Sequence, residues 1–263
     1  MNKYSIIKNN TEFNIIGKYS LDWFIPNIMN GNWELDTFSI LDSYQNQDKI
    51  YIDIGAWIGP TVLYSANKFK QIICFEPDPI AIERLNDNLS VNNFTNIIVI
   101  TKALSNTNSV SIFGGNGDLG NSMSTLLVSL DNKEDFYNDY GRGGFLSYNE
   151  RKSNIIQVDT ITIESTLDQY NIDPMNIGLI KMDIEGGEII VIPSMISFLE
   201  KYKPNFYISL HRVFLLEKDI NIILNILFKI YDNCYYIDSN YIKVKVDIHT
   251  IQKNGLTSII FEQ

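Results

Sequence analysis

The chain has 263 residues, which is enough for one α/β domain with extensions, and we expect a single domain. Its formal net charge of -10 and its pI near 4.7 oppose non-specific binding to nucleic acid or to an anionic membrane, because both are polyanions. No apolar run approaches the length that crosses a bilayer, and the polar start MNKYSIIKNNTEF lacks the apolar core of a signal peptide, so we expect a cytoplasmic protein.

The first 48 residues are rich in aromatic side chains but show no clear alternation of strands and helices. Two interpretations stay open for this segment. It packs over the edge of the domain, or it covers a cofactor cleft and brings Trp33 and Glu34 near the ligand. We therefore divide the chain into an N-terminal extension, 1–48, and a main domain, 49–263.

A strand, a glycine turn and a helix are predicted in succession after this extension. The apolar run from Ile50 to Ile54 is typical of a strand buried on both faces by helices. Gly55 and Gly59 indicate a tight turn, and Pro60 suits the first position of a helix. This is the opening βα unit of a Rossmann-like sheet.

An acid inside this turn determines which ligand the unit can hold. Asp53 stands where a dinucleotide fingerprint requires glycine, and its carboxylate would repel a diphosphate. It could instead accept a hydrogen bond from the ammonium group of S-adenosylmethionine, which has no phosphate. Glu76 ends the next predicted strand, where a carboxylate can hold a ribose diol. D-x-G-x-x-x-G is therefore interpreted as a methyl-donor loop, with a purely structural βα turn as the alternative.

The middle of the chain continues the alternation and then changes character. The expected elements are a helix from Asp78 to Val91 with Asp78 as its N-cap, strands Asn96–Ile100 and Ser109–Phe113, the latter antiparallel or at an edge, and strand Ile155–Ile161. Between them, residues 114–153 are rich in glycine and polar side chains with weak periodicity. Such a long segment inside a compact domain predicts a functional lid or a disordered insertion.

Three charged residues alternate with apolar residues in the stretch from Ile177 to Glu188. Lys181, Asp183 and Glu185 would share one face of a strand. A strand covered on both faces cannot bury three charges without a large desolvation penalty, so we expect them at its carboxyl end, where ligands bind in open α/β sheets. A structural ion pair with Lys181 is the alternative for the two acids. Glu188 is interpreted as a helix cap.

The strand Asn205–Leu210 is predicted to end at His211 and to lie beside the strand that carries Asp183. His211 could then face the same cleft, and both a catalytic and a structural role stay open for it. The tail predicts a helix over Asp219–Tyr231 and a final antiparallel pair, Tyr241–Asp247 with Thr257–Glu262.

Three motifs carry a resemblance to a known family. They are D-I-G-A-W-I-G-P from Asp53, F-E-P from Phe75 and I-K-M-D-I-E-G from Ile180. Over roughly residues 30 to 215 the chain resembles the FkbM-type S-adenosylmethionine-dependent methyltransferases. The resemblance implies the seven-stranded class I sheet and methyl transfer to a hydroxyl on a sugar, glycan or small natural product. The candidate cofactor residues are Asp53, Gly55, Ala56, Trp57, Gly59, Glu76, Pro77, Asp78 and Asp183.

An alcohol acceptor must lose its proton, which requires a base or a metal that lowers its pKa. The candidate catalytic residues are His211, Asp183, Glu185 and Lys181. We hypothesise that His211 is the base and that Asp183 and Glu185 orient the hydroxyl or, with His211, hold a divalent cation such as magnesium or calcium. Two alternatives remain. The protein could be a non-catalytic cofactor-binding or assembly subunit, or it could be an NAD-dependent oxidoreductase, although Asp53 in place of glycine argues against the latter.

Overall fold

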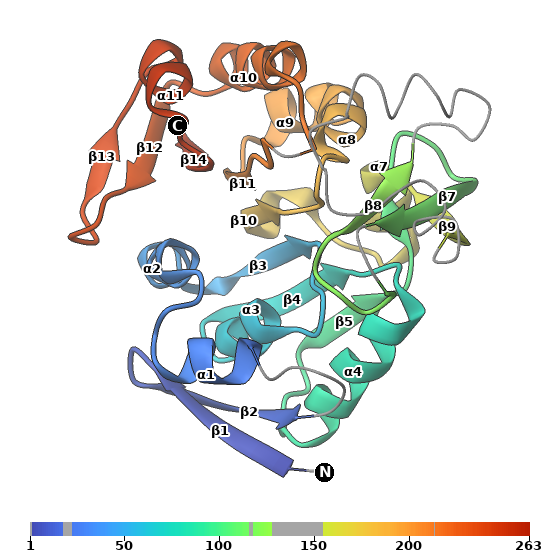
Figure 1. Cartoon of the computed structure of the whole chain (residues 1–263). Coiled ribbons are helices and arrows are strands. Elements are labelled where there is room, and N and C mark those ends of the chain that lie inside the picture. Colours follow the sequence, from blue (N-terminus) through green and yellow to red (C-terminus); the bar gives the residue numbers. More distant parts are fainter. Residues whose placement is uncertain (1, 18–22, 116–117, 128–154, 213) are drawn as a thin grey trace.

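The computed structural model describes residues 2–17, 23–115, 118–127, 155–212 and 214–263, and its centre is an eight-stranded sheet (Figure 1). The strand order from one edge to the other is β13 (Lys243–Lys245), β12 (Asn233–Ile237), β14 (Ser258–Glu262), β11 (Asn205–Ser209), β10 (Ile177–Met182), β3 (Asn46–Ile54), β4 (Phe69–Phe75) and β5 (Ile97–Ile100). Strands β11, β10, β3, β4 and β5 are parallel to their neighbours in this run. Parallel strands bring their carboxyl ends to one edge, which places the ends of β3, β4, β10 and β11 together.

The far end of the sheet differs from the prediction. Strand β14 pairs antiparallel with both β11 and β12, and β13 pairs with β12. The predicted pairing of Tyr241–Asp247 with Thr257–Glu262 is therefore wrong, because β12 lies between these segments. The predicted number of seven strands is also wrong, because the sheet has eight strands, with β13 at its edge. Helix α11 (Ile248–Asn254) joins β13 to β14.

Helices cover both faces of the sheet, as the unbroken apolar runs of its strands predict. One core joins alternate residues of β3, such as Ile52 and Ile54, to a first group of helices. These are α7 (Ile163–Gln169), α8 (Glu188–Ser194), α9 (Ile196–Tyr202), α10 (Glu217–Ile230) and α11. The second core contains Tyr51 of β3 and the helices of the opposite face. These are α1 (Phe24–Met29), α2 (Leu35–Ser43), α3 (Pro60–Ser65) and α4 (Pro79–Ser90).

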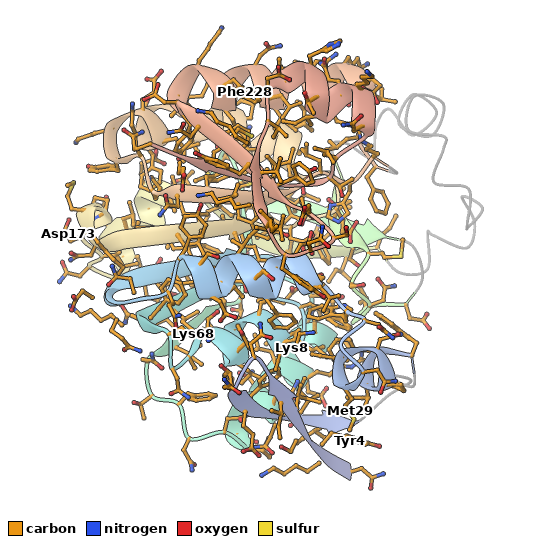
Figure 2. All side chains as sticks on the ribbon, turned by 90° about the vertical axis from the view of Figure 1, so that its left-hand side faces the viewer. Tyr4, Lys8, Met29, Lys68, Asp173 and Phe228 are labelled. Carbon is orange, nitrogen blue, oxygen red and sulfur yellow. The ribbon has the colours of Figure 1, made fainter. Side chains whose placement is uncertain are left out.

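Side chains fill both layers (Figure 2). On the α10 side, for example, Phe228 meets Phe261 of β14 edge-on with ring centroids 5.3 Å apart. Between α3 and α4, Gly59 has φ 88° and a Cβ there would come 2.4 Å from Leu85 Cδ1. Glycine at position 59 is thus required by the close packing of the two helices.

Two smaller units lie beside the main sheet. The N-terminal segment forms a hairpin of β1 (Asn2–Lys8) and β2 (Thr11–Gly17), which the sequence did not predict. A second sheet has the order β6 (Ala103–Leu104), β9 (Ile156–Ile161), β7 (Val110–Gly115) and β8 (Ser124–Leu127). Strand β7 is antiparallel to both its neighbours, as expected for Ser109–Phe113, but it belongs to this separate sheet.

A short 3-10 turn, η2 (Pro174–Asn176), leads into β10. Most of the predicted insertion, residues 128–153, lies outside the described residues, and its first part contributes β8. Within the part of the chain that the structure describes, no helix has the length and apolar character needed to cross a membrane.

Candidate active site

Two cavities meet at the carboxyl ends of the parallel strands. The apolar cavity, of about 560 Å³, is lined by side chains that include Leu104, Phe113, Leu126 and Glu76. The polar cavity, of about 490 Å³, is lined by residues that include Glu34, Lys181, Asp183, Glu185 and His211. Both are bordered by Gly55, Trp57, Ser122, Asp183 and Glu185. One site therefore has an apolar half and a charged half with a common border.

Glu76 lines only the apolar cavity, whereas Asp183 and Glu185 lie on its border with the polar cavity. Glu76 follows β4, is 6% exposed, and accepts a hydrogen bond at each oxygen, from the Trp57 backbone N–H at 2.8 Å and from the Asp78 backbone N–H at 2.8 Å. Burial raises the pKa of Glu76 to about 7, although these two hydrogen bonds oppose the rise. The carboxylate is held rigidly and keeps lone pairs for a ligand hydroxyl.

Trp57 lies on the border of both cavities, and its indole ties the turn to the loop that carries Gly120. Its backbone is left-handed, with φ 50°, and its Nε1 donates to the Gly120 carbonyl at 2.9 Å. The Gly120 carbonyl also accepts from Arg84 Nη1, and the Gly120 N–H donates to Asp78 Oδ2. Asp78 caps α4 as predicted, but it is 1% exposed and lines neither cavity. It lies behind the residues that line the cavity, where it fixes the loop that carries Gly120.

Asp53 lies in the floor beneath the turn and is fully buried. Its Oδ2 accepts from Thr61 Oγ1 at 2.5 Å, and its Oδ1 lies 3.4 Å from Lys181 Nζ. It is absent from the lining of both cavities, so the geometry does not give it the direct contact with a donor ammonium that the sequence predicted. Gly55 does border the site: its φ of 92° and a Cβ position 2.0 Å from the Asp183 carbonyl oxygen exclude any side chain there.

Lys181 is 2% exposed within β10, although a desolvation argument predicted it at the open end of the strand. Its burial is compensated by two carboxylates, because Nζ also lies 3.1 Å from Asp183 Oδ2. Burial alone would lower the pKa of Lys181, but Asp183 and Asp53 outweigh it and raise the pKa. The structural ion pair considered for Asp183 is thus present, and it occupies one of the two Asp183 oxygens.

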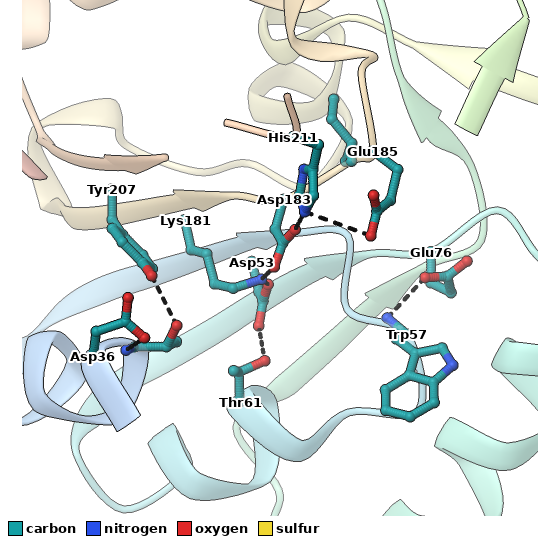
Figure 3. A network of polar contacts seen from close by, with 12 residues as sticks. Asp36, Asp53, Trp57, Thr61, Glu76, Lys181, Asp183, Glu185, Tyr207 and His211 are labelled. Carbon is teal, nitrogen blue, oxygen red and sulfur yellow. Dashed lines mark hydrogen bonds and ion pairs between the residues drawn. The ribbon is translucent and has the colours of Figure 1, made fainter. Parts of the chain in front are cut away.

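The other Asp183 oxygen belongs to an acid–histidine cluster of Asp183, Glu185 and His211 (Figure 3). His211 Nε2 lies 3.2 Å from Asp183 Oδ1 and 3.5 Å from Glu185 Oε1. Burial lowers the pKa of His211, but the surrounding carboxylates outweigh it and raise the pKa to about 9. Burial raises the pKa of Glu185 to about 8 against the effect of His211. Lys181 and His211 hold the pKa of Asp183 below its ordinary value although burial opposes them.

Glu188 supports this cluster from behind. It is fully buried, its Oε1 accepts from the Ile184 N–H and its Oε2 accepts from the Gly186 N–H. Oε1 also lies 3.6 Å from His211 Nδ1, just beyond hydrogen-bond distance. Glu188 does open α8 as an acid in its first turn, but the predicted capping by its side chain is wrong: its carboxylate makes no cap hydrogen bond and instead fixes the turn that presents Glu185.

The N-terminal segment contributes to the polar cavity through Trp33 and Glu34. Glu34 precedes α2 with a left-handed backbone, φ 41°, and burial, assisted by the Asp183 carboxylate, raises its pKa to about 7. Phe24 joins Trp33 to Trp57, with ring centroids 5.1 Å and 4.9 Å away respectively. Of the two interpretations of residues 1–48, the geometry matches the one that places Trp33 and Glu34 at the cleft.

The remaining predicted cofactor residues divide into two groups. Gly55, Ala56, Trp57 and Pro77 border a cavity, whereas Gly59 only packs against α4. Sequence reasoning missed Thr61, which holds Asp53 and lines the polar cavity, and it missed the apolar walls supplied by the second sheet. Pairing between strands far apart in sequence forms those walls, and no local signal marks them.

The sheet order and the joined cavities at the carboxyl ends are those of a Rossmann-like α/β protein of the methyltransferase type. A family model described as the methyltransferase FkbM domain matches residues 53–236, well over half of the chain. The chain belongs to this family. No curated protein matches it.

Solved structures of low sequence identity resemble the chain. A methyltransferase FkbM from Methylobacillus flagellatus KT is 16% identical, with a TM-score of 0.48, over 91% of this chain and 55% of that one. The chain thus spans about half the length of that protein. A precorrin-6y C5,15-methyltransferase from Geobacter metallireducens is 11% identical, with a TM-score of 0.44, over 86% of each chain. A Streptococcus mutans protein solved with SAH is 10% identical, with a TM-score of 0.42, over 86% of this chain and 96% of that one.

Proposed function

We propose that the protein transfers a methyl group from S-adenosylmethionine to a hydroxyl of a glycan, sugar or other small hydroxylated molecule. The observation that supports this function is the junction of two chemically different cavities at Gly55 and Trp57. One is a half-site for an apolar ring and a diol, and the other is a half-site for hydroxyl groups. A methyltransferase must bind a donor and an acceptor in contact, and these two half-sites meet that requirement.

The residues of the apolar cavity fit the donor. The Glu76 carboxylate can accept hydrogen bonds from ribose hydroxyls, and Leu104 and Phe113 offer apolar surface to an adenine ring. Gly55 leaves the backbone of the turn open to close approach by a ligand. When bound, the donor supplies an electrophilic methyl carbon, so that the acceptor oxygen forms a bond to carbon while the bond from carbon to sulfur breaks and S-adenosylhomocysteine is left.

The acid–histidine cluster fits the acceptor. Its carboxylates can accept hydrogen bonds from hydroxyl groups and so orient an alcohol oxygen toward the shared border of the cavities. The proton that leaves the hydroxyl passes to a group at this cluster, with His211 as the candidate base. Because the carboxylates raise the pKa of His211 to about 9, only the fraction of His211 that has lost its own proton can act as this base, and that fraction grows as the pH rises toward 9. An acidic cavity of this kind favours neutral, hydroxyl-rich acceptors over phosphorylated ones.

Turnover on a panel of acceptors tests the proposal. Purified protein is incubated with S-adenosylmethionine and individual sugars, glycosides, polyols and phenols, and formation of S-adenosylhomocysteine is followed by mass spectrometry. Product that carries one additional O-methyl group supports the proposal. Donor binding without turnover on any acceptor favours a binding or assembly subunit, and binding of NAD in place of the methyl donor favours an oxidoreductase.

A further inference from the structure

We propose that Asp183, Glu185 and His211 bind one divalent metal cation in the polar cavity, beside the site for the methyl donor. One oxygen or nitrogen atom from each of these three side chains lies within 4.8 Å of the other two. His211 Nε2 is 3.2 Å from Asp183 Oδ1 and 3.5 Å from Glu185 Oε1. Ligand atoms at about 2.1 Å from one ion lie about 3 Å apart in an octahedral face, so the two distances from His211 Nε2 are close to those of such a face.

The cluster is held in position before any ligand arrives. Glu185 has a left-handed backbone, with φ 54°, and Gly186 follows with φ 101°. The buried Glu188 carboxylate accepts from the N–H groups of Ile184 and Gly186 on either side of that residue, which fixes this turn. Non-glycine residues in this conformation are strained and persist at sites where the surrounding structure enforces them. The direction of the Glu185 carboxylate is therefore imposed by the fold.

Glu188 also provides the outer contact that metal-binding histidines commonly have. Its Oε1 is 3.6 Å from His211 Nδ1, and no other hydrogen-bond partner reaches Nδ1 among the described residues. A proton on Nδ1 that points at Glu188 leaves the lone pair of Nε2 directed at Asp183 and Glu185. Carboxylate–histidine–metal arrangements fix the tautomer of the ligating imidazole in this way.

The charges of the cavity leave room for a cation. Lys181 neutralises Asp183 through Oδ2 and leaves Oδ1 on the side of His211. Glu34 lines the same cavity, and its Oε2 is buried with no hydrogen-bond partner among the described residues. Three carboxylates thus line the polar cavity beside Lys181, which already contacts two acids, and His211, which must give up its proton at Nε2 to bind a metal. A buried carboxylate oxygen without a partner is costly, and a hydrated cation would compensate it.

Two carboxylates suit hard cations such as Mn²⁺ and Mg²⁺, and the imidazole favours Mn²⁺ because Mn²⁺ binds nitrogen ligands more strongly than Mg²⁺ does. Three protein ligands leave positions open for water and for an acceptor hydroxyl. This catalytic role rests on the proposed function: a hydroxyl bound to the cation loses its proton more readily, and His211 then acts as a ligand and no longer as the base. Binding of the cation itself does not depend on that function.

Titration with Mn²⁺, followed by electron paramagnetic resonance, tests the site. We expect one Mn²⁺ per chain, and a dissociation constant about tenfold or more weaker in Asp183→Asn and Glu185→Gln. Glu164→Gln, at an exposed carboxylate on α7, should bind as the wild type does. No binding at millimolar Mn²⁺, or equal binding by the wild type and both cluster variants, would overturn the proposal.

A measurement on the folded wild type avoids dependence on variant stability. Electron spin echo modulation should show a nitrogen nucleus coupled to the bound Mn²⁺, and the coupling should persist in His249→Asn, which removes the other histidine of the chain. Bound Mn²⁺ without nitrogen coupling contradicts the assignment. Calorimetry with S-adenosylmethionine separates the two proposals: donor binding without Mn²⁺ binding removes the metal site alone, whereas Mn²⁺ binding without donor binding removes the proposed function alone.

Discussion

The two cavities are built in opposite ways. In the apolar cavity, the carboxylate of Glu76 is held by two backbone N–H groups, and the nearby loop is held in place through Gly120. At and beneath the polar cavity, charged side chains of β3, β10, the turn after β10 and the segment after β11 hold one another in place. Hydrogen bonds from the backbone hold a side chain in one position and so define one position for its ligand. Side-chain charge pairs leave protonation and ligand exchange open, which is what a reacting centre requires.

This contrast predicts that changes in the polar cavity affect turnover and stability, whereas changes around Glu76 affect donor affinity. The predictions that follow separate the two cavities, from the largest expected effect to the smallest.

Asp183→Asn and His211→Ala should each lower the rate of methyl transfer by about 10²–10⁴-fold, because they remove groups that orient and deprotonate the acceptor. Steady-state kinetics with a hydroxylated acceptor measures the effect. Calorimetry of the donor is the matched control, since the Glu76 contacts stay intact and donor affinity should change little. Unchanged turnover in both variants would contradict the assignment of the polar cavity.

Lys181→Met should lower the free energy of unfolding by about 3–5 kcal/mol, because Asp53 and Asp183 lose their shared cation in a buried site. Urea unfolding followed by circular dichroism measures the loss. Lys229→Met, at an exposed position of α10, should change the free energy of unfolding by less than about 0.5 kcal/mol. Equal stability of the two variants would show that Lys181 does not compensate these acids.

Donor affinity should fall as the pH drops below about 7. The pKa of Glu76 is raised to about 7 by burial. Ribose hydroxyls make stronger, charge-assisted hydrogen bonds to the ionised carboxylate than to its protonated form, so donor binding favours ionised Glu76 and weakens once Glu76 is protonated. The decrease should approach about tenfold per pH unit below that pKa. Calorimetric titration with the donor at about six pH values from 5.5 to 8.5 gives the donor affinity as a function of pH. In Glu76→Gln the affinity should depend much less on pH. A slope that survives this change would assign the titration to another group.

Trp57→Phe should weaken donor binding by about fivefold, equivalent to about 1 kcal/mol. The change removes the Nε1 donor that reaches the Gly120 carbonyl, while Arg84 still donates to the same oxygen. Calorimetry of the donor measures it, and Trp23→Phe, at a half-exposed ring stacked on Trp57, is the control with little expected effect. A larger loss of donor affinity in Trp23→Phe than in Trp57→Phe would show that the Trp23 ring, and not the Trp57 indole, supports the donor site.

The sequence indicated the β3 turn and both acid-bearing strand ends because each is a local pattern. The apolar run before Gly55, Glu76 after β4 and the alternation around Asp183 can all be recognised without knowledge of distant residues. The position of His211 beside Asp183 could also be predicted, since neighbouring parallel strands end at one edge.

Contacts over long sequence separations could not be predicted. Lys181 is buried because Asp53, 128 positions away, pairs with it, and Asp53 is withdrawn from the cavity by Thr61 in the next helix. At the C-terminus, Asp238, Ser239 and Asn240 are typical turn residues, but β12 before them is a short segment, and its place between β13 and β14 depends on sheet pairing that this local signal does not report. Tertiary packing, which propensity does not report, determined each of these outcomes.

The central claim is that the cavity around Glu76 binds the methyl donor. Titration calorimetry of S-adenosylmethionine against the wild type and Glu76→Gln at pH 8 tests it most directly, with NAD as the comparison ligand. We predict one donor site per chain, an affinity about 10–100-fold weaker in the variant, which corresponds to the loss of charge-assisted hydrogen bonds, and no binding of NAD. Equal donor affinity in both proteins, or binding of NAD in place of the donor, would contradict the account.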